Sequence, residues 1–355
     1  MKKVIITGIL GQDGANMAEY LLSLYDEFGC EEYDYEIYGM MRRSANPNLK
    51  NIEKIKNHPR FNLQFLDLGD SASIDTAVKE IEPDYFINFA ANSFVGISWK
   101  MPEQVMNVNA LGVLRCLEAI RKFKPDCRFY SAGSSEEWGN VDYSPQDINH
   151  PIKPRSPYGA SKAAARHLVK VYRESYNMYA VHGILFNHEG TKRGEEFVTR
   201  KISKGVARIK DALDSMIFEE EAPDPIELGN LDAKRDWSDS RDFVEGVWLM
   251  LNQDSPKDYI LSSGEAHSIR EFIEKAFAVA GIKGSWRGEG LDEVFVDGDQ
   301  VLVKINPEFY RPAEVDLLLG DSTPIRKELG WEPKISFDKL VESMVKYDLD
   351  EARHN

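Results

Sequence analysis

Residues 4–14 read Val4-Ile5-Ile6-Thr7-Gly8-Ile9-Leu10-Gly11-Gln12-Asp13-Gly14. The short, β-branched apolar run at the start predicts a buried strand, and a helical pattern begins at Asn16. Glycines spaced G-x-x-G-x-x-G between a strand and a helix permit a tight turn, close approach of the backbone to a pyrophosphate, and close packing of helix on strand. The stretch therefore predicts a dinucleotide-binding turn with Gly8, Gly11 and Gly14 at the cofactor.

Strands and helices then alternate regularly up to about residue 186. This alternation predicts an α/β fold with a Rossmann-type, doubly wound parallel sheet. Long helices are expected over residues 16–25 and 102–123. The expected strands are residues 4–6, 36–41, 63–66, 85–89, 128–131 and 179–186.

The residues that follow these strands are candidates for binding, because ligands of open parallel sheets lie at the carboxyl ends of the strands. Asp67 and Leu68 follow the third strand, where the adenine of a dinucleotide would lie. Ala90 and Ala91 follow the fourth, and their small side chains would let the cofactor pass close to the sheet.

The second expected strand ends in Arg42 and Arg43. A fold specific for NAD would place an acidic residue here to bind the ribose 2′-hydroxyl. Two guanidinium groups instead suit a 2′-phosphate. The sequence predicts NADP as the cofactor, and the alternative interpretation is an ordinary solvated basic pair.

A candidate catalytic pair, Tyr158 and Lys162, lies in the segment R-S-P-Y-G-A-S-K. The alanine-rich run that follows favours a helix, so both side chains would share one helical face. A lysine ammonium there would lower the pKa of the tyrosine and let it accept a proton from a hydroxyl group. The alternative is a surface pair at helical spacing, because Y-x-x-x-K is a common pattern.

Composition excludes several classes of protein. The 355 residues carry a formal net charge of −15, which argues against nucleic-acid binding, because such proteins need a basic face. The apolar runs are far shorter than the ~18 residues that a membrane span needs, and a strand begins at once, so we expect a cytoplasmic protein without a membrane partner. Three cysteines without C-x-x-C spacing predict neither a disulfide framework nor a metal site.

The pattern becomes irregular after Asn187. Helices are expected near residues 197–213, 243–251, 269–280 and 337–347, a short strand near 259–261, and an exposed acidic loop over 219–225. We therefore expect residues 1–186 to form the Rossmann domain, joined by parts of 226–255 and 306–321. Residues 187–355 would form mainly a smaller, mixed α/β substrate domain.

Several motifs together resemble the extended short-chain dehydrogenase/reductase superfamily and, over nearly the whole chain, its GDP-mannose 4,6-dehydratase family. The motifs are the glycine turn with Gln12-Asp13, Met41-Arg42-Arg43-Ser44, Arg155-Ser156-Pro157-Tyr158, Tyr172-Arg173-Glu174-Ser175-Tyr176, residues 183–189, residues 193–202, residues 228–231, Arg235-Asp236-Trp237, and residues 310–315.

The resemblance implies an NADP-dependent lyase that dehydrates GDP-mannose to GDP-4-keto-6-deoxy-mannose. Tyr158 would take the proton of the 4-hydroxyl as hydride leaves carbon 4 for NADP, and Lys162 would hold the nicotinamide ribose. Glu136 would then remove the proton of carbon 5 and help expel the 6-hydroxyl as water. Ser134 would hydrogen-bond the 4-hydroxyl and the ketone that forms. Hydride would return to carbon 6, regenerating NADP.

The resemblance also implies binding residues and a homo-oligomer, either a dimer or a tetramer in which the loop after Arg42 reaches a neighbour's cofactor site. Arg235 could alternatively form a structural ion pair with Asp236. Further cofactor residues would be Gln12, Asp13, His188 and Arg193, and the GDP sugar would contact Ser93, Ser134, Ser135, Glu136, Asn187, Val198, Lys201, Arg235, Arg311 and Glu314.

Three departures from the family pattern leave the substrate open. Glu137 and Trp138 stand where leucine and tyrosine are expected, and Phe94 stands where histidine is expected. Because Phe94 and Trp138 would lie near the sugar, another GDP sugar such as a GDP-manno-heptose or an N-acetylated hexose is an alternative substrate. Further alternatives are a nucleotide-sugar 4-epimerase or reductase, and a non-catalytic NADP-binding module.

Overall fold

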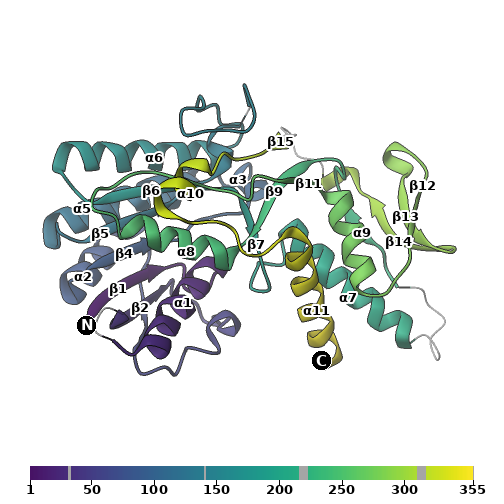
Figure 1. The fold of residues 1–355 in the computed structure, drawn as a ribbon, viewed down its shortest axis with the longest axis horizontal. Helices are drawn as coiled ribbons and strands as arrows, with labels where there is room; N and C mark the ends of the chain where they lie inside the picture. Colours follow the sequence, from purple (N-terminus) through teal and green to yellow (C-terminus); the bar gives the residue numbers. More distant parts are fainter. Residues whose placement is uncertain (31–32, 140, 216–222, 310–316, 355) are drawn as a thin grey trace.

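The computed structural model describes residues 1–30, 33–139, 141–215, 223–309 and 317–354. A large parallel sheet with helices on both faces holds the N-terminus, and a smaller part built around α7, α9 and α11 holds the end of the chain (Figure 1). Residues 219–222 of the expected acidic loop, and the motif at residues 310–315, lie outside the described residues.

The large sheet has seven strands, all paired in parallel, as the alternating pattern predicts. Strand β1 lies between β2 and β4, so the order of the strands reverses there, and a crevice for ligands is expected at that point. In spatial order the strands are β10 (Ile260–Leu261), β6 (Ala180–Leu185), β5 (Arg128–Ala132), β4 (Tyr85–Asn88), β1 (Lys2–Thr7), β2 (Tyr35–Met41) and β3 (Phe61–Phe65).

Alternate residues of β1 point to opposite faces of the sheet and feed two separate cores. Val4 and Ile6 pack in the cluster formed with α1 (Gln12–Phe28) and α8 (Ser240–Leu251). Ile5 packs in the cluster on the other face. That face is covered by α2 (Ser71–Ile81), α5 (Gly112–Phe123) and α6 (Pro157–Tyr176). A strand buried on both faces is therefore apolar throughout, as residues 4–6 are.

Shorter elements shape the edge of the sheet where the strands end. The expected helix over residues 102–123 consists of α4 (Pro102–Met106), a π-helical turn η3 (Asn107–Leu111) and α5. The remaining short helices are η2 (Lys50–Ile52), α3 (Val95–Ser98), η4 (Ser135–Glu137), η5 (Gly290–Asp292), η6 (Pro307–Phe309) and α10 (Thr323–Leu329).

The smaller part contains two further sheets and a separate apolar core between them and the helices. Its helices are α7 (Val198–Ser215), α9 (Ile269–Val279) and α11 (Phe337–His354). One sheet has β7 (Asn187–Glu189), β9 (Lys234–Asp239), β11 (Ala266–Ser268) and β15 (Leu317–Leu318). The other has β8 (Ile226–Leu228), β12 (Ser285–Arg287), β13 (Val294–Asp297) and β14 (Gln300–Ile305).

Strands β12 to β14 were not predicted from the sequence. Strands β12 and β13 have three and four residues, and the pairing register shifts between Phe295 and Val296, so little alternation marks them. Strand β14 has six residues and follows an Asp-Gly turn, a hairpin signal that the prediction missed. The domain boundary at residue 186 stays a prediction. One strand of the large sheet, β10, comes from the part of the chain beyond that residue.

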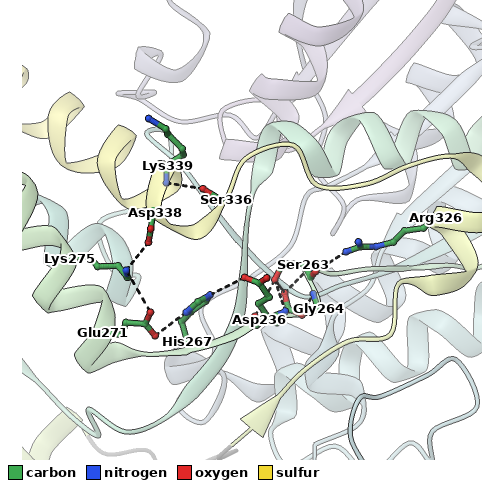
Figure 2. A network of polar contacts seen from close by, with 11 residues as sticks. Asp236, Ser263, Gly264, His267, Glu271, Lys275, Arg326, Ser336, Asp338 and Lys339 are labelled. Atoms are coloured by element: carbon green, nitrogen blue, oxygen red, sulfur yellow. Dashed lines mark hydrogen bonds and ion pairs between the residues drawn. The ribbon is translucent and has the colours of Figure 1, made fainter.

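Asp236 anchors β9 to the connection between β10 and β11, as Figure 2 shows. Its carboxylate is buried and accepts hydrogen bonds from the backbone N–H of Ser263 (2.7 Å), from the Ser263 hydroxyl (2.6 Å) and from the N–H of Gly264 (2.9 Å). Arg326 in turn donates to the Ser263 carbonyl (2.7 Å). Neighbouring residues of a strand point to opposite sides, so Arg235 faces away from this network.

Polar and ring contacts that start at His267 on β11 join α9 to the start of α11 (Figure 2). The His267 ring stacks on Phe337, with 3.8 Å between ring centroids, and its Nδ1 lies 2.9 Å from Glu271. Lys275 bridges Glu271 and Asp338, at 3.9 Å and 2.8 Å. These contacts hold α9 and the start of α11 against strand β11, which pairs with β9.

None of the helices in the described ranges is long and apolar enough to cross a membrane. Within the same ranges, His, Cys, Asp and Glu side chains form no group of three or more that would suit a metal ion.

Candidate active site

A cavity of about 1490 Å³ opens at the carboxyl ends of β1, β2, β4 and β5 and extends between the large sheet and the smaller part. Its walls come from the glycine turn, from the residues after those strands, from α6, and from the first turns of α7. The cavity therefore lies at the point where the strand order reverses, as expected for a ligand of such a sheet.

The glycine turn forms one wall and leaves no room for side chains. Gly8 has φ +69°, and a Cβ there would lie 2.8 Å from the backbone nitrogen of Ala90. A Cβ on Gly14 would lie 2.4 Å from the Gly8 carbonyl oxygen. Helix α1 begins directly after Gly11, which has no side chain to cap it. The free N–H groups of its first turn therefore suit an anionic group in the cavity.

Most residues predicted for the site line this one cavity. Because these residues line one cavity, they lie close together in space. Their individual roles stay predictions. From the cofactor set these are Gly8, Gly11, Gln12, Asp13, Gly14, Arg42, Asp67, Leu68, Ala90, Ala91, Tyr158, Lys162, His188 and Arg193. From the substrate set they are Ser93, Ser134, Ser135, Glu136, Asn187, Val198, Lys201 and Arg235.

Two expected positions turn out differently, and two further predicted residues are not described by the structure. Arg43 is exposed and does not line the cavity, so only Arg42 of the pair faces it. Trp138 was expected near the sugar, but it is fully buried against Ile184 and Phe186 and lies outside the lining. Arg311 and Glu314 lie outside the described residues.

Helix α6 presents Tyr158 and Lys162 because of how it begins. The Ser156 hydroxyl accepts a hydrogen bond from the Gly159 N–H (3.0 Å), and Pro157 occupies the first turn. Both features are typical of a helix N-terminus. A Cβ on Gly159 would lie 2.4 Å from the Glu136 carbonyl oxygen, so this glycine lets the helix approach the η4 loop closely. Tyr158 and Glu136 are thereby brought to the same cavity.

The pKa values of the pair differ from the sequence-based expectation. Burial raises the pKa of Tyr158 to about 12, although a hydrogen bond with Ser134 acts in the opposite direction. Burial also lowers the pKa of Lys162 to about 8. The Lys162 ammonium donates to the Ala132 carbonyl (2.6 Å) and lies 5.9 Å from the centre of the tyrosine ring. Burial therefore outweighs the two effects that lower the pKa of Tyr158, the Ser134 hydrogen bond and the positive charge of Arg193.

Glu137, next to Glu136 in the chain, does not line the cavity and is not a solvated loop carboxylate. Its side chain is 0% exposed. Oxygen Oε1 accepts the Ser134 N–H (2.9 Å) and lies 2.8 Å from Nε2 of His182 on β6. Residues 134–137 form a capping box, and their pattern S-x-x-E is the signal that could have revealed the buried role. Nothing in the sequence marks His182 as its partner.

Asn109 was also missed. It lies in the π-helical turn η3 and is buried. Its side chain accepts the Asn92 N–H (2.8 Å) and donates to the Asn92 carbonyl (3.2 Å) and to the Ser161 hydroxyl (3.1 Å). It thus fixes the segment that carries Ser93 into the cavity relative to α6.

Asp13 and His188 link the glycine turn to β7. Asp13 Oδ2 lies 2.9 Å from His188 Nε2, and its Oδ1 accepts from the Ser240 hydroxyl (2.8 Å). Gln12 donates to the His188 carbonyl (2.9 Å). Burial acts against the charge of both groups, but their mutual attraction is larger and lowers the pKa of Asp13 to about 2 and raises that of His188.

Replacing His188 by Gln should therefore weaken the fold in a pH-dependent way. A raised pKa in the folded state means that His188 stabilises fully below its unfolded pKa of about 6.5, and that this contribution is lost as pH rises through the folded value. The Asp13 contribution is lost only as pH falls towards about 2. We expect a loss of unfolding free energy of about 1 kcal/mol near pH 5, shrinking above neutrality. Denaturant unfolding across this range measures it.

The pair of His58 and Asp26 offers a matched control, because it joins the same residue types at 3.6 Å with the Asp26 side chain 63% exposed. His58→Gln should change the stability little at any pH. A loss in His188→Gln that stayed constant between acidic and alkaline pH would contradict the prediction.

Cations gather in the cavity of this acidic protein. Arg42, Lys192, Arg193, Lys201 and Arg235 all line it. Arg193 pairs with Glu189 (3.0 Å) and stacks on Phe197, while Lys201 lies 3.7 Å from the ring centre of Phe309. Among the described residues that line the cavity, basic side chains outnumber acidic ones, so the cavity suits phosphate-bearing ligands.

Comparison with known proteins assigns the chain to a group. The family model described as GDP-mannose 4,6 dehydratase matches residues 5–344. A Drosophila melanogaster protein named GDP-mannose 4,6 dehydratase is 43% identical over 100% of this chain and 88% of its own length. A Homo sapiens protein of the same name is 41% identical over 99% and 92%. A Vibrio cholerae protein named GDP-mannose 4,6-dehydratase is 39% identical over 100% and 95%.

Solved structures share the fold at lower identity. A dTDP-glucose 4,6-dehydratase from Bacillus anthracis, in complex with NAD, matches with a TM-score of 0.78 and 18% identity over 99% of this chain and 98% of its own. RMD from Pseudomonas aeruginosa, complexed with NADPH, matches with a TM-score of 0.74 and 20% identity over 99% and 100%. Similarity at this level of identity concerns the fold alone.

Proposed function

The chain belongs to the GDP-mannose 4,6-dehydratase family, and we propose that it is an NADP-dependent lyase that converts GDP-mannose to GDP-4-keto-6-deoxy-mannose. The observation that carries the proposal is the meeting of Ser134, Glu136, Tyr158 and Lys162 in one cavity together with the glycine turn. An acid/base pair and a separate carboxylate beside a dinucleotide site are what oxidation followed by elimination requires.

The residues present fit a nicotinamide dinucleotide. The turn at Gly8 and Gly14 is closed to side chains, and the uncapped start of α1 suits a pyrophosphate. Arg42 follows β2, where it would meet a ribose 2′-phosphate, and Lys162 would hold the nicotinamide ribose. When bound, the cofactor supplies the two-electron acceptor for oxidation at carbon 4 and the donor for reduction at carbon 6.

Tyr158 is the proposed base for the 4-hydroxyl, and Ser134 is its partner. With its pKa raised to about 12, the tyrosine is a phenol at neutral pH and needs positive charge nearby to release its proton. Lys162, on the next turn of α6, lies close enough to supply that charge. The Ser134 hydroxyl, which already hydrogen-bonds Tyr158, would also hold the sugar oxygen as the ketone forms.

Glu136 is the proposed acid/base at carbons 5 and 6. Its N–H donates to the Ser134 hydroxyl (3.2 Å), so the turn of η4 holds it beside the serine. Once carbon 4 is a ketone, the hydrogen on carbon 5 is acidic enough for a carboxylate to remove. The same group, now protonated, can give the proton to the departing 6-hydroxyl, which leaves as water.

The cations of the cavity support binding of the GDP diphosphate. Arg235 and Lys201 reach the cavity from β9 and α7, and Asn187 begins β7 beside them. The alternative structural pair of Arg235 with Asp236 is not favoured, because the Asp236 carboxylate is taken up by Ser263 and Gly264. Arg311 and Glu314 stay predictions from the resemblance.

Proton NMR with GDP-mannose in deuterated water tests the proposal. We expect a 4-keto-6-deoxy product that carries deuterium at carbon 5, with no net reduced cofactor. A product epimerised at carbon 4 with an intact 6-hydroxyl would favour a 4-epimerase, and net consumption of reduced cofactor would favour a reductase. Tight NADP binding without turnover of any GDP sugar would favour a non-catalytic module.

Another GDP sugar is the second candidate substrate, and one residue favours it. Phe94 lines the cavity, is 37% exposed, and meets Phe197 edge-on with 6.0 Å between ring centroids. These rings form an apolar surface where the family pattern has histidine. Comparing turnover of GDP-mannose with that of a GDP-manno-heptose and an N-acetylated hexose would separate the substrates, since the chemistry at carbons 4 to 6 is shared.

Arg42→Glu should reverse the preference for NADP. We expect NADP affinity to fall by about 100-fold relative to NAD, because a charge-assisted hydrogen bond is lost and a repulsive charge is added. Fluorescence titration of both reduced cofactors measures it. Arg43→Glu makes the same charge change outside the cavity and should alter the ratio much less. Equal affinities of the unmodified protein for NADP and NAD would contradict the assignment.

The proposal includes a cytoplasmic homo-oligomer, a dimer or a tetramer. Apolar side chains on the outer side of the helices before α5 support self-association, since Met106 and Leu111 are 37% and 45% exposed. Light scattering of the purified protein would distinguish the two states.

A further inference from the structure

A buried carboxylate lies directly behind the active-site turn and has no part in the reaction as described so far. Glu137 is one residue from Glu136, yet it points into the protein and is 0% exposed. Burying an ionised carboxylate costs several kcal/mol unless partners compensate. The reaction as described does not explain why a carboxylate is buried next to the catalytic residues.

Its partners come from three elements. The Ser134 N–H donates to Oε1 (2.9 Å), His182 Nε2 on β6 lies 2.8 Å from the same oxygen, and Arg166 Nη1 on α6 lies 3.8 Å from Oε2. Burial acts to raise the pKa of Glu137, but its contacts with His182, Arg166 and the Ser134 N–H together lower it, so the group is ionised at neutral pH. The His182 ring is as buried as the carboxylate.

The turn between β5 and η4 is held between this carboxylate and Lys162. The Lys162 ammonium donates to the Ala132 carbonyl at one end of the turn (2.6 Å), and Glu137 accepts the Ser134 N–H at the other. A Cβ on Gly133 would lie 2.3 Å from His182 Nε2 and 2.7 Å from Glu137 Oε1. The turn therefore packs against Glu137 and His182 at Gly133, and it contacts the Lys162 ammonium at Ala132.

The elements around Lys162 carry other titratable groups that bear on its charge. Two carboxylates raise its pKa against the larger effect of burial, first Glu137 and then Asp13. Asp13 is already engaged with His188 and Ser240. Two tyrosines also belong to these elements: Tyr158, on the same helix as Lys162, and Tyr130, on β5.

We propose that Glu137 is a positioning residue, the buried counter-charge of Lys162 across the Ala132–Ser134 turn, with His182 and Arg166 holding it in place. It orients the Ser134 backbone and keeps an ammonium beside Tyr158. The proposal rests on the proposed function, because it gives Glu137 a part in the same site, but its test does not depend on turnover.

The test is the titration of Lys162 in protein labelled with ¹³C at the lysine ε-carbon, without substrate. Loss of one signal in Lys162→Met assigns the resonance. In Glu137→Gln, which keeps an amide oxygen for the Ser134 N–H, the midpoint should fall by about one pH unit from its value of about 8. The alkaline limb of the kcat profile should move the same way. A Lys162 midpoint equal to that of the unmodified protein would overturn the proposal.

Two further variants keep the test decisive. Asp258→Asn removes a carboxylate that accepts the backbone N–H of His182 (2.8 Å) and pairs with Arg173 (2.6 Å), and it should leave the midpoint in place. Arg166→Gln removes a cation next to Glu137 and should raise the midpoint. If Glu137→Gln fails to fold, as judged by near-ultraviolet circular dichroism, an unchanged midpoint in Arg166→Gln would refute the idea.

Each of the two proposals can be refuted without refuting the other. If GDP-mannose is not converted, the dehydratase assignment falls, while a lowered Lys162 midpoint in Glu137→Gln still supports the counter-charge. If GDP-mannose is converted and the midpoint does not move, Glu137 is only a structural group.

Discussion

Tyr158→Phe should reduce kcat with GDP-mannose by about 1000-fold, equivalent to about 4 kcal/mol of transition-state stabilisation. The change removes only the hydroxyl that would take the proton of the 4-hydroxyl group as hydride leaves carbon 4. The phenylalanine ring can occupy the same buried place on α6, so fold and cofactor affinity should be retained. Initial rates by NMR, with a fluorescence titration of NADPH, measure both effects.

Tyr143→Phe provides the matched control. That tyrosine is 43% exposed, its hydroxyl donates to Asp147 (2.9 Å), and it does not line the cavity. Its loss should leave kcat unchanged. If Tyr158→Phe retained more than about a tenth of the rate, another group would have to be the base at carbon 4.

Glu136→Gln should abolish elimination and leave oxidation at carbon 4 in place. Glutamine keeps the size of the side chain and the backbone contact of η4 with Ser134, but it cannot accept a proton. We expect kcat for the 4-keto-6-deoxy product to fall by about 1000-fold. Because the first step survives, addition of GDP-mannose to the NADP-loaded variant should produce bound reduced cofactor, visible by its near-ultraviolet absorbance.

The exchange of carbon 5 with solvent distinguishes this result from misfolding. In deuterated water the unmodified enzyme should place deuterium at carbon 5, and Glu136→Gln should place none. Glu103→Gln, on α4 and outside the cavity, makes the same charge change and should behave like the unmodified enzyme. Turnover nearly intact in Glu136→Gln would instead indicate a 4-epimerase or a reductase, which has no need of this carboxylate.

Local patterns in the sequence predicted the fold because they are set by near neighbours. The apolar strand of residues 4–6, the glycines after it and the alternation up to residue 186 were enough to predict the doubly wound sheet, which the structure confirms. Tyr158 and Lys162 share a helix, so their spacing already places them on one face. Strands β12 and β13 are too short to show such a pattern and were missed, as was the six-residue β14.

The candidate site was predictable where a residue follows directly on a strand or begins a helix. Asp67, Ala90 and Asn187 line the cavity for that reason, because all carboxyl ends of the parallel strands meet at one edge. Which of two adjacent residues faces the cavity depended on side-chain direction. The sequence could not choose between Arg42 and Arg43, nor place Trp138 inside the core.

By itself, the spacing of residues along the chain determined the sheet, the glycine turn and the pair of Tyr158 and Lys162. The roles of Ser134 and Glu136 were predicted from the resemblance to the family. Only the tertiary structure decided their electrostatic environment. His182 and Arg166 lie on elements distant from Glu137 in the chain, and together they keep a carboxylate ionised where water is excluded. Burial likewise raises the pKa of Tyr158, where the spacing to Lys162 alone predicted a lower value. Charges act through space and are amplified by burial, and sequence spacing describes neither.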